Sequence, residues 1–345
     1  LRSYHTIHLA QHVDVLQQTA AGQQSNESFV VRRPPRRRFV AQGDCYARVQ
    51  LVDIGTGEVL DETALPTDGS ESVTLTAEPV LTGDATWSIQ LVTSEPDLVP
   101  ENNVHPFDIE LVDRPLRVLF VEGYPRWEYR YLKNLLIRER SIDSSVMLLS
   151  ADRDFAQEGN APITRLPRSP EEFARFDVIV VGDVPATFFS SDHLEMIRSH
   201  VAERGAGMLW IGGPRSTPST YTGTALADLL PMRGSLALPE IGGPVNLAPA
   251  PRAERLGVLR LVTDDGPGWP AELRDPTYHW SQLWFAQRIE PARLKPTAEV
   301  LATTVDPVDG MRLPLVTHLR YGAGQTIYVA TDEIWRWRYG RGERY

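Results

Sequence analysis

Acidic side chains follow several stretches of the chain that read as buried strands. They are Glu122, Asp152, Asp183, Asp332 and Glu333, and the arginines near them in sequence are Arg126, Arg130 and Arg336. Carboxylates that meet at one edge of a sheet could hold a divalent cation or accept hydrogen bonds from a polyhydroxyl ligand. A second interpretation, which we favour, is that the acids cap helices and pair with the arginines, and so fix the loops.

A nucleophile would have to stand on the sharp turn after the apolar stretch 207–211. That turn reads Gly212-Gly213-Pro214-Arg215 and contains no Cys, Ser or Thr. Ser216 follows it, but without the Gly-x-Ser-x-Gly pattern of a serine hydrolase. A pair of Ser216 with His279 or His318 is an alternative that we do not favour. We therefore expect no catalytic residue, no metal and no cofactor.

Residues 116–140 predict the unit that positions these side chains. The apolar run from Val118 to Val121 reads as a buried strand, and Glu122 to Pro125 reads as a turn. A helix follows, whose apolar face is predicted to carry Trp127, Tyr131 and Leu135 at i, i+4 and i+8, with Leu132 and Leu136 beside them. Open α/β sheets bind ligands at the carboxyl ends of their strands, so Glu122 and the start of the helix lie where a site would be.

The chain after this unit alternates between predicted strands and helices. Strands are predicted at 145–149, 177–181 and 207–211. One helix is predicted to begin at Ser169, with Glu172 completing a capping box, and another to begin near Ser191 and stop at Gly205. Further strands are predicted at 298–303, 313–320 and 326–330. This order predicts a flavodoxin-like α/β fold, in which a mostly parallel sheet has helices on both faces.

The first part of the chain has a different sequence pattern. Residues 29–113 contain short alternating runs separated by turn clusters about every ten residues, which predicts a small antiparallel β-sandwich. The stretch Glu101-Asn102-Asn103 resembles a turn of immunoglobulin-like adhesion domains. Residues 1–28 are predicted to be an N-terminal arm or linker, in which His5, His8 and His12 are exposed rather than metal-bound.

Composition sets limits on the possible partners. The 345 residues are too many for one core of ordinary size, and the net charge of -10 argues against nonspecific nucleic-acid binding. One basic run, at 32–38, reads as a solvated loop, and Cys45 is the sole cysteine.

The longest apolar runs are far short of the ~20 residues that span a bilayer. The chain starts at Leu1, so we expect it to be a piece of a longer protein.

An insertion is predicted at 231–296, where Pro and Gly are frequent and no clear period is present. Its aromatic cluster, residues 278–285, is expected to pack the insertion onto the sheet. A platform for a sugar or a peptide is the alternative.

The segment 114–345 resembles a class I glutamine amidotransferase-like domain. The resemblance rests on Glu122-Gly123, on the strand 176–183, on the strand and elbow 206–213 and on the hairpin 321–324. Active members of that fold use a Cys at the elbow, a His and a Glu. Here Gly212-Gly213 stands at the elbow and Thr331 at the position implied for the His, so the resemblance implies a degenerate site in which only Glu333 remains.

A closer resemblance is carried by residues 122–130 and 331–338. These stretches are similar to the amidotransferase-like domain of large bacterial membrane-anchored proteins that also have von Willebrand A and immunoglobulin-like segments. The resemblance implies an extracytoplasmic domain of the cell envelope, held at a membrane through segments outside this chain.

These observations favour a noncatalytic interaction or ligand-sensing module that recognises a protein partner or a small polar ligand. The alternative is a hydrolase or carbohydrate-binding protein, similar to the trehalose-utilisation branch of the same fold, that uses acids of the crevice. The predicted ligand crevice consists of Glu122, Tyr124, Arg126, Asp183, Gly212, Gly213, Arg215, Asp332 and Glu333.

Overall fold

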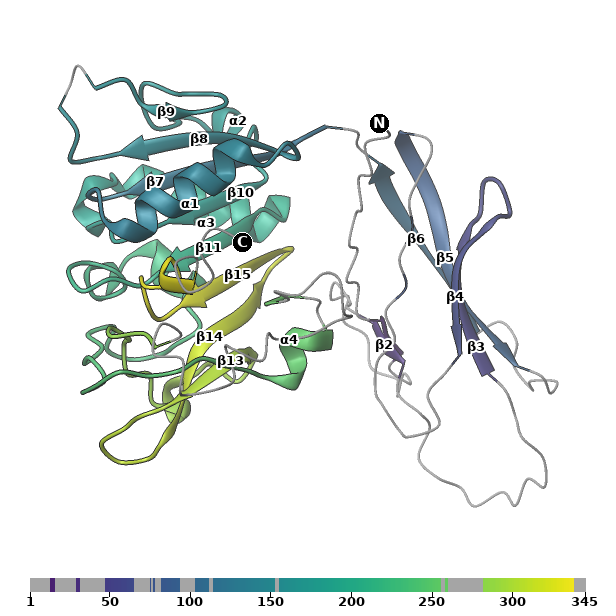
Figure 1. Cartoon of the computed structure of the whole chain (residues 1–345). Coiled ribbons are helices and arrows are strands. Elements are labelled where there is room, and N and C mark those ends of the chain that lie inside the picture. Colours follow the sequence, from purple (N-terminus) through teal and green to yellow (C-terminus); the bar gives the residue numbers. More distant parts are fainter. Residues whose placement is uncertain are drawn as a thin grey trace. The chain divides into compact units, whose positions relative to one another are not determined.

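The chain divides into two compact units, Leu1–Arg114 and Pro115–Tyr345 (Figure 1). The computed structural model describes residues 13–15, 29–31, 47–64, 75, 77, 82–93, 103–111, 114–152, 155–255, 258–259 and 282–337. Several sequence predictions fall outside the described residues: the three histidines of the arm, the basic run 32–38, Cys45, residues 101–102 and residues 278–281.

The first unit contains one four-stranded antiparallel sheet, in the order β4 (Val59–Ala64), β3 (Ala47–Asp53), β5 (Gly83–Thr93) and β6 (Val104–Leu111). Its small core is built around Trp87, which is fully buried and meets Phe107 edge to face. In addition, β1 (Val13–Val15) and β2 (Phe29–Val31) form a separate short parallel pair. The described strands therefore do not form the predicted immunoglobulin-like sandwich, which needs a second sheet packed on the first.

The second unit is built on a nine-stranded sheet. Its centre is parallel, in the order β15 (Gly324–Val329), β11 (Gly207–Ile211), β10 (Val178–Val181), β7 (Leu116–Glu122) and β8 (Ile142–Leu148). Antiparallel strands extend both edges: β14 (Arg312–Tyr321), β13 (Ala298–Val305) and β12 (Ala248–Pro249) beyond β15, and β9 (Glu158–Gly159) beyond β8.

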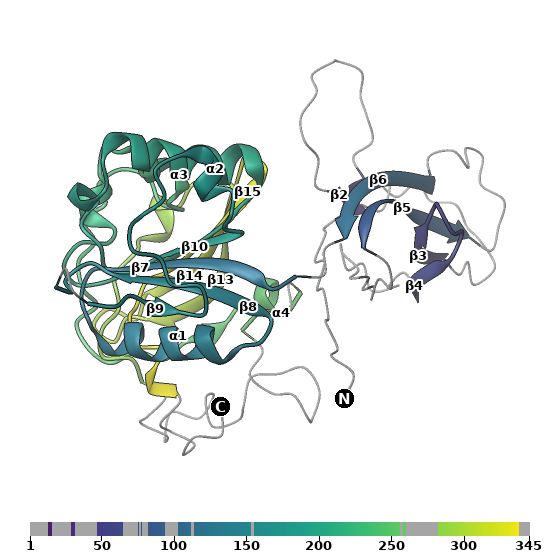
Figure 2. The ribbon, with the colours of Figure 1, turned by 90° about the horizontal axis from the view of Figure 1, so that it is seen from above.

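The helices of this unit are few and mostly short. Only α1 (Trp127–Arg138) and α3 (Ser191–Arg204) exceed five residues among the described helices. The others are α2 (Pro170–Phe173), α4 (Pro251–Arg255), η2 (Ala186–Phe188), η3 (Ser219–Tyr221), η4 (Ala225–Leu229) and η6 (Pro291–Arg293). In the view from above, α1 lies on one face of the sheet and α2 and α3 lie on the other (Figure 2).

The predicted flavodoxin-like fold with a mostly parallel sheet is wrong. Of the eight described strand pairings in this sheet, four are parallel and four are antiparallel. The physical reason lies in the last third of the chain, where β13, β14 and β15 follow one another without a helix between them. A parallel connection needs a crossover of a dozen or more residues, whereas the tight turn between Tyr321 and Gly324 can join only antiparallel neighbours.

The central strands are buried on both faces. Along β7, Val118 and Phe120 pack toward α1, and Leu119 and Val121 pack toward the opposite core. Successive side chains of a strand point to opposite faces, so a strand covered on both sides reads as a continuous apolar run. The larger core, on the side of α3, includes Trp210 and many side chains of the described part of 231–296.

Helix α1 faces the sheet with only part of the predicted apolar face, because Leu132 and Leu136 pack against the sheet and Trp127 and Leu135 do not. Trp127 and Leu135 are 50% and 58% exposed, while Tyr129 and Leu136 are buried against Phe120 and its neighbours. Two apolar stripes overlap on this helix, and the one that begins at Tyr129 covers the sheet.

Within the described residues, no helix combines the length and the apolarity needed to span a bilayer.

Candidate functional site

Glu122 is the central buried acid at the carboxyl edge of the sheet. It is 0% exposed, and its Oε1 accepts hydrogen bonds from the backbone N–H groups of Gly123 and Asp183, both at 2.9 Å. Its Oε2 accepts from Arg126 Nε at 2.9 Å. Burial raises the pKa of Glu122, against the opposing charge of Arg126. This carboxylate therefore joins the ends of β7 and β10 and has no face open to a ligand.

Arg126 connects three chain segments around Glu122. Its Nη1 donates to the carbonyl of Gly212 at 3.2 Å and to Asp332 Oδ2 at 3.0 Å. Burial raises the pKa of Asp332, and the nearby guanidinium opposes this rise. Nη2 of Arg126 is buried and has no hydrogen-bond partner among the described residues. The arginine thus acts as an internal brace that ties the ends of β7 and β11 to the residues after β15.

Asp183 holds the loop that follows β11. Its Oδ1 accepts from the backbone N–H groups of Ser216 at 2.7 Å and Thr217 at 2.8 Å. Its Oδ2 accepts from the N–H of Arg215 at 3.0 Å and from the hydroxyl of Tyr124 at 3.1 Å. Burial, with the charge of Asp183, raises the pKa of Tyr124 to about 12. With four donors on its two oxygens, Asp183 has a structural role.

The glycine elbow has no room for a nucleophile. A Cβ at Gly212 would lie 2.4 Å from Gln287 Oε1, and a Cβ at Gly213 would lie 2.3 Å from Asp183 Cγ. Gln287, which the sequence analysis did not single out, is buried here and donates to the carbonyls of Gly213 at 2.9 Å and Thr217 at 2.8 Å. The space of a catalytic side chain is therefore filled from the neighbouring segments.

The residues after β15 hold the insertion in place. Thr331 Oγ1 donates to the carbonyl of Phe285 at 2.7 Å, and Glu333 Oε2 accepts from the N–H groups of Trp284 and Phe285. Glu333 Oε1 accepts from Arg336 at 2.6 Å. The position implied for a histidine thus serves packing between segments.

The alternative serine and histidine pair is not assembled. The two ring nitrogens of His318 contact Glu299 Oε2 at 3.2 Å and Gln325 Oε1 at 3.1 Å, so neither faces Ser216. His279 lies outside the described residues. In the described part of the chain, no group of three or more His, Cys, Asp or Glu side chains is placed to hold a metal ion.

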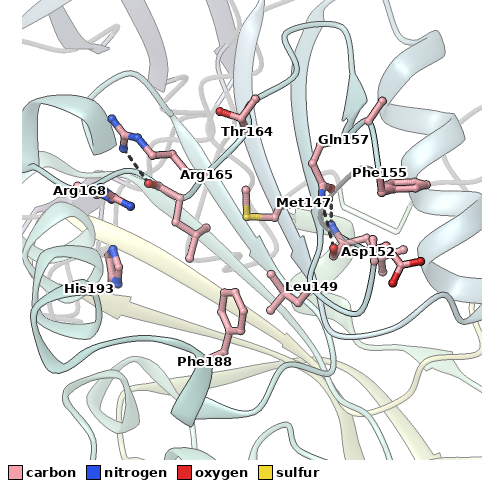
Figure 3. A pocket seen from close by; sticks show the side chains of 14 residues that line it. Met147, Leu149, Asp152, Phe155, Gln157, Thr164, Arg165, Arg168, Phe188 and His193 are labelled. Atoms are coloured by element: carbon pink, nitrogen blue, oxygen red, sulfur yellow. Dashed lines mark hydrogen bonds between the residues drawn. The ribbon is translucent and has the colours of Figure 1, made fainter.

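The structure therefore brings eight of the nine predicted crevice residues into one bonded network, and Glu333 into an adjacent one. Asp152, which the sequence analysis grouped with these acids, lies elsewhere and is exposed. It lines an open pocket of about 480 Å³ at the carboxyl end of β8 (Figure 3).

This pocket has an apolar floor and a polar rim. Met147 and Leu149 lie between the two sides of the pocket, and the ring of Phe188 points into it (Figure 3). Phe155 and Phe188 are 41% and 43% exposed. Asp152 lines the same side as Phe155 in this view. The pocket thus offers two aromatic rings to a bound molecule.

Some polar side chains of the pocket are fixed and others are available. Gln157 is bound to the backbone N–H and carbonyl of Leu148, and Arg165 pairs with Glu172 at 2.7 Å. No hydrogen bond is recorded for the side chains of Asp152, Thr164 and Arg168 to other described residues, and all three are exposed. His193 uses Nδ1 to cap α3 at Ser190, which leaves Nε2 for another partner.

The sequence analysis missed this pocket because its walls come from distant segments. Residues 147–168 and 188–193 contribute to it, and the loop 155–168 has no periodic pattern. The one signal in the sequence was the pair of aromatic residues in otherwise polar loops.

No protein-family model matches the chain, and a search of curated proteins found no match. Among solved structures, the chain is similar to the exo-β-1,4-mannosidase Op5Man5 from Opitutaceae bacterium strain TAV5. The TM-score is 0.34 and the identity 19%, over 64% of this chain and 31% of that one. A β-galactosidase from Bacillus circulans sp. alkalophilus gives a TM-score of 0.34 and 13% identity, over 66% and 30%. One from Halorubrum lacusprofundi gives 0.31 and 16%, over 67% and 30%.

The chain thus spans less than a third of the length of these structures. Those structures are a mannosidase and β-galactosidases. The flavodoxin-like description expected from the motifs is corrected by the sheet of this chain, in which four of the eight described strand pairings are antiparallel. The motif resemblance itself, at 122–130 and 331–338, stays a prediction.

Proposed function

We propose that this chain binds a saccharide, without cleaving it, in the pocket at the carboxyl end of β8. The observation that carries the proposal is the combination of two exposed phenylalanine rings with unengaged polar side chains around a cavity of about 480 Å³. Pockets of this size, with an apolar lining and a few polar groups that fix orientation, are typical of small-molecule sites.

The lining matches the chemistry of a sugar ring. A pyranose has faces of C–H groups and a rim of hydroxyls. The C–H groups suit the negative face of an aromatic ring, which Phe155 and Phe188 supply. Hydroxyls both donate and accept, so they suit a carboxylate such as Asp152 and a guanidinium such as Arg168.

We expect no cleavage because the described lining of the pocket contains a single carboxyl group. Glycoside hydrolysis ordinarily uses two carboxyl groups that flank the bond to be broken. Asp152 is the one acid among the described residues that line the pocket. Glu122 and Asp183 are enclosed in their own hydrogen bonds and cannot serve as the second.

A thermal-shift screen with glucose, galactose, mannose and β-linked disaccharides, followed by calorimetric titration, tests the proposal. At a concentration 100 times its Kd, a ligand stabilises the folded state by about 2.7 kcal/mol, which raises Tm by several degrees. We expect Phe188→Ala to remove the shift, because the ring that faces the sugar is lost. Trp284→Ala is the matched control, since Trp284 is 55% exposed in the same unit and does not line this pocket.

Three results would overturn the proposal. The first is a sugar-induced shift that persists in Phe188→Ala, and the second is the lack of any shift across the panel. The third is turnover of p-nitrophenyl glycosides that Asp152→Asn abolishes, because this would make the pocket a catalytic site.

A further inference from the structure

A cluster of aromatic and basic side chains lies on the outer side of α1, outside the saccharide pocket. We call it the aromatic–arginine face, and it consists of Trp127, Arg130, Tyr131, Leu135, Trp335 and Arg336. Trp127 and Leu135 are half exposed or more. None of these six side chains belongs to the lining of the saccharide pocket.

The three rings of this face form a staggered patch. The centroid of Trp127 lies 6.2 Å from that of Tyr131 and 5.6 Å from that of Trp335, and Tyr131 lies 6.0 Å from Trp335. The ring planes differ by 30° or less. If the three rings formed a single stack, the centroids of the two outer rings would lie about twice as far apart as those of adjacent rings. The nearly equal separations therefore mean that the rings lie side by side and offset.

The charges on this face are positive. The guanidinium of Arg130 lies 5.6 Å from the centroid of Trp127, and that of Arg336 lies 4.7 Å from the centroid of Trp335. No ion pair of Arg130 with another described residue is recorded, whereas Arg336 pairs with Glu333. Arg130 is thus a cation placed beside an exposed ring and available to an anionic partner.

The acids near this face are already engaged. Glu128 is buried and accepts from the N–H of Trp335 at 3.3 Å. Glu158 accepts from Lys133 at 2.6 Å and from the hydroxyl of Tyr129 at 2.9 Å. The face is therefore cationic on a chain whose net charge is -10.

A groove of about 330 Å³ runs beside the face along α1. It is lined by Pro125, Arg126, Trp127, Tyr129, Arg130 and Lys133. Positions 126, 129, 130 and 133 lie on one side of a helix, so the groove follows the helix axis for two turns. It is deep enough to take side chains and too small for a folded element.

We propose that this groove and the aromatic–arginine face bind an acidic peptide segment of a partner protein. A carboxylate of the peptide pairs with Arg130, in the two-pronged geometry that guanidinium groups favour. Two apolar side chains of the peptide cover Trp127 and Leu135, which are about 12 Å apart along the helix axis. Trp, Tyr and Arg are the residues that dominate binding energy at protein interfaces, and the face combines all three around exposed apolar surface.

Selection from a displayed library of random 12-residue peptides, with the full chain as bait, tests the proposal. The enriched peptides are then synthesised with a fluorophore and titrated by anisotropy. We expect them to combine Asp or Glu with Leu, Ile, Phe or Trp. We expect Arg130→Glu and Trp127→Ala each to weaken binding at least tenfold, and raised salt to weaken it further.

Two matched variants serve as controls. Arg175→Glu makes the same charge change at an exposed position that follows α2, on the other side of the sheet, and Trp284→Ala removes an exposed ring outside the face. Both should bind the peptides like the unaltered chain. Trp127 and Arg130 are exposed, so their replacement should leave the core intact, and circular dichroism is used to check that the variants fold.

Several outcomes would overturn the proposal. Enriched peptides that lack acids, or that bind Arg130→Glu unchanged, would do so. Dimerisation of the chain that Trp127→Ala abolishes would assign the face to a second copy. Binding to phosphatidylglycerol vesicles that depends on Trp127, with no peptide enriched, would assign it to a lipid surface.

Discussion

At the scale of single residues, the burial of the Glu128 carboxyl group should have a measurable effect on how stability depends on pH. It lies in the first turn of α1, is 7% exposed, and accepts a hydrogen bond from Trp335 N–H. Burial raises the pKa of Glu128 to about 7, although this hydrogen bond and the charge of Arg126 oppose the rise. The folded state therefore holds this proton more tightly than the unfolded chain does.

We expect the free energy of unfolding to fall as pH rises from about 4.5 through 7. A carboxyl group with a raised pKa in the folded state contributes stability that is fully present below its unfolded pKa and is lost as pH rises through its folded pKa. Glu128→Gln keeps the shape without the charge, so it should flatten this part of the curve. The expected gain over the unaltered chain at pH 8 is about 3 kcal/mol, measured by urea unfolding at pH 5, 6, 7 and 8.

Glu203→Gln is the control for this series, because Glu203 is an exposed glutamate on α3. Its curve should run parallel to that of the unaltered chain. If Glu128→Gln also ran parallel, burial of an ionisable group at position 128 would be contradicted.

At the scale of elements, the turn after β11 shows how a strand end can be closed to chemistry. Gly213 leaves space that the carboxylate of Asp183 occupies, and Asp183 in turn orders the N–H groups of the following loop. The turn is therefore a packing device between β10 and β11.

Gly213→Ala should lower the free energy of unfolding by about 3 kcal/mol and the melting temperature by roughly 10 °C. The added Cβ would lie 2.3 Å from Asp183 Cγ, which the backbone contacts of Asp183 hold in place. Gly242→Ala is the matched control: its Cβ would meet only Val308 Cγ2, at 3.3 Å, and Val308 is 76% exposed and able to move. Equal melting temperatures for the two variants would contradict the close packing at the elbow.

The local elements could largely be predicted from the sequence, because their signals are short-range. Ser169 caps α2 by accepting from Glu172 N–H, with Pro170 in the first turn, and α3 ends at Gly205 with a φ of 76°. The side of α1 that faces the sheet could be predicted only in part, because two stripes on it have a helical period: Leu132 and Leu136 face the sheet, whereas Trp127 and Leu135 are exposed. The antiparallel outer strands and the pocket at β8 depend on contacts between distant segments, which leave no local pattern.

The positions of most acids after the strands, and their pairing with an arginine, could be predicted from the sequence. Glu122 and Asp332 converge on Arg126, as expected if the acids fix the loops, whereas Asp152 lies elsewhere. Their burial is a tertiary property that residue types alone do not give. Gln287, which completes the network, comes from a stretch without any periodic signal.

At the scale of the whole molecule, the two units have separate cores. Every residue of the two core clusters around the nine-stranded sheet comes from position 118 or later, and every residue of the third cluster comes from position 111 or earlier. Each unit therefore holds the apolar contacts that its own folding requires.

We expect residues 115–345 to fold when produced alone and to keep both proposed binding sites. Calorimetry should give a melting transition within a few degrees of one seen in the full chain, and sugar and peptide affinities should be unchanged. A shortened chain that fails to melt cooperatively would contradict the independence of the second unit.

The close packing of glycines against the buried acids limits which substitutions homologous sequences can accept. A Cβ at Gly182 would lie 2.2 Å from Glu122 Oε2, just as one at Gly213 would overlap Asp183. A side chain at either glycine would overlap the neighbouring acid, and loss of either acid would remove its hydrogen bonds. A single substitution at either member of a pair should therefore lower stability. Homologous sequences should therefore alter the two members of a pair together, and a lineage that replaces Glu122 by a small residue becomes free to fill position 182.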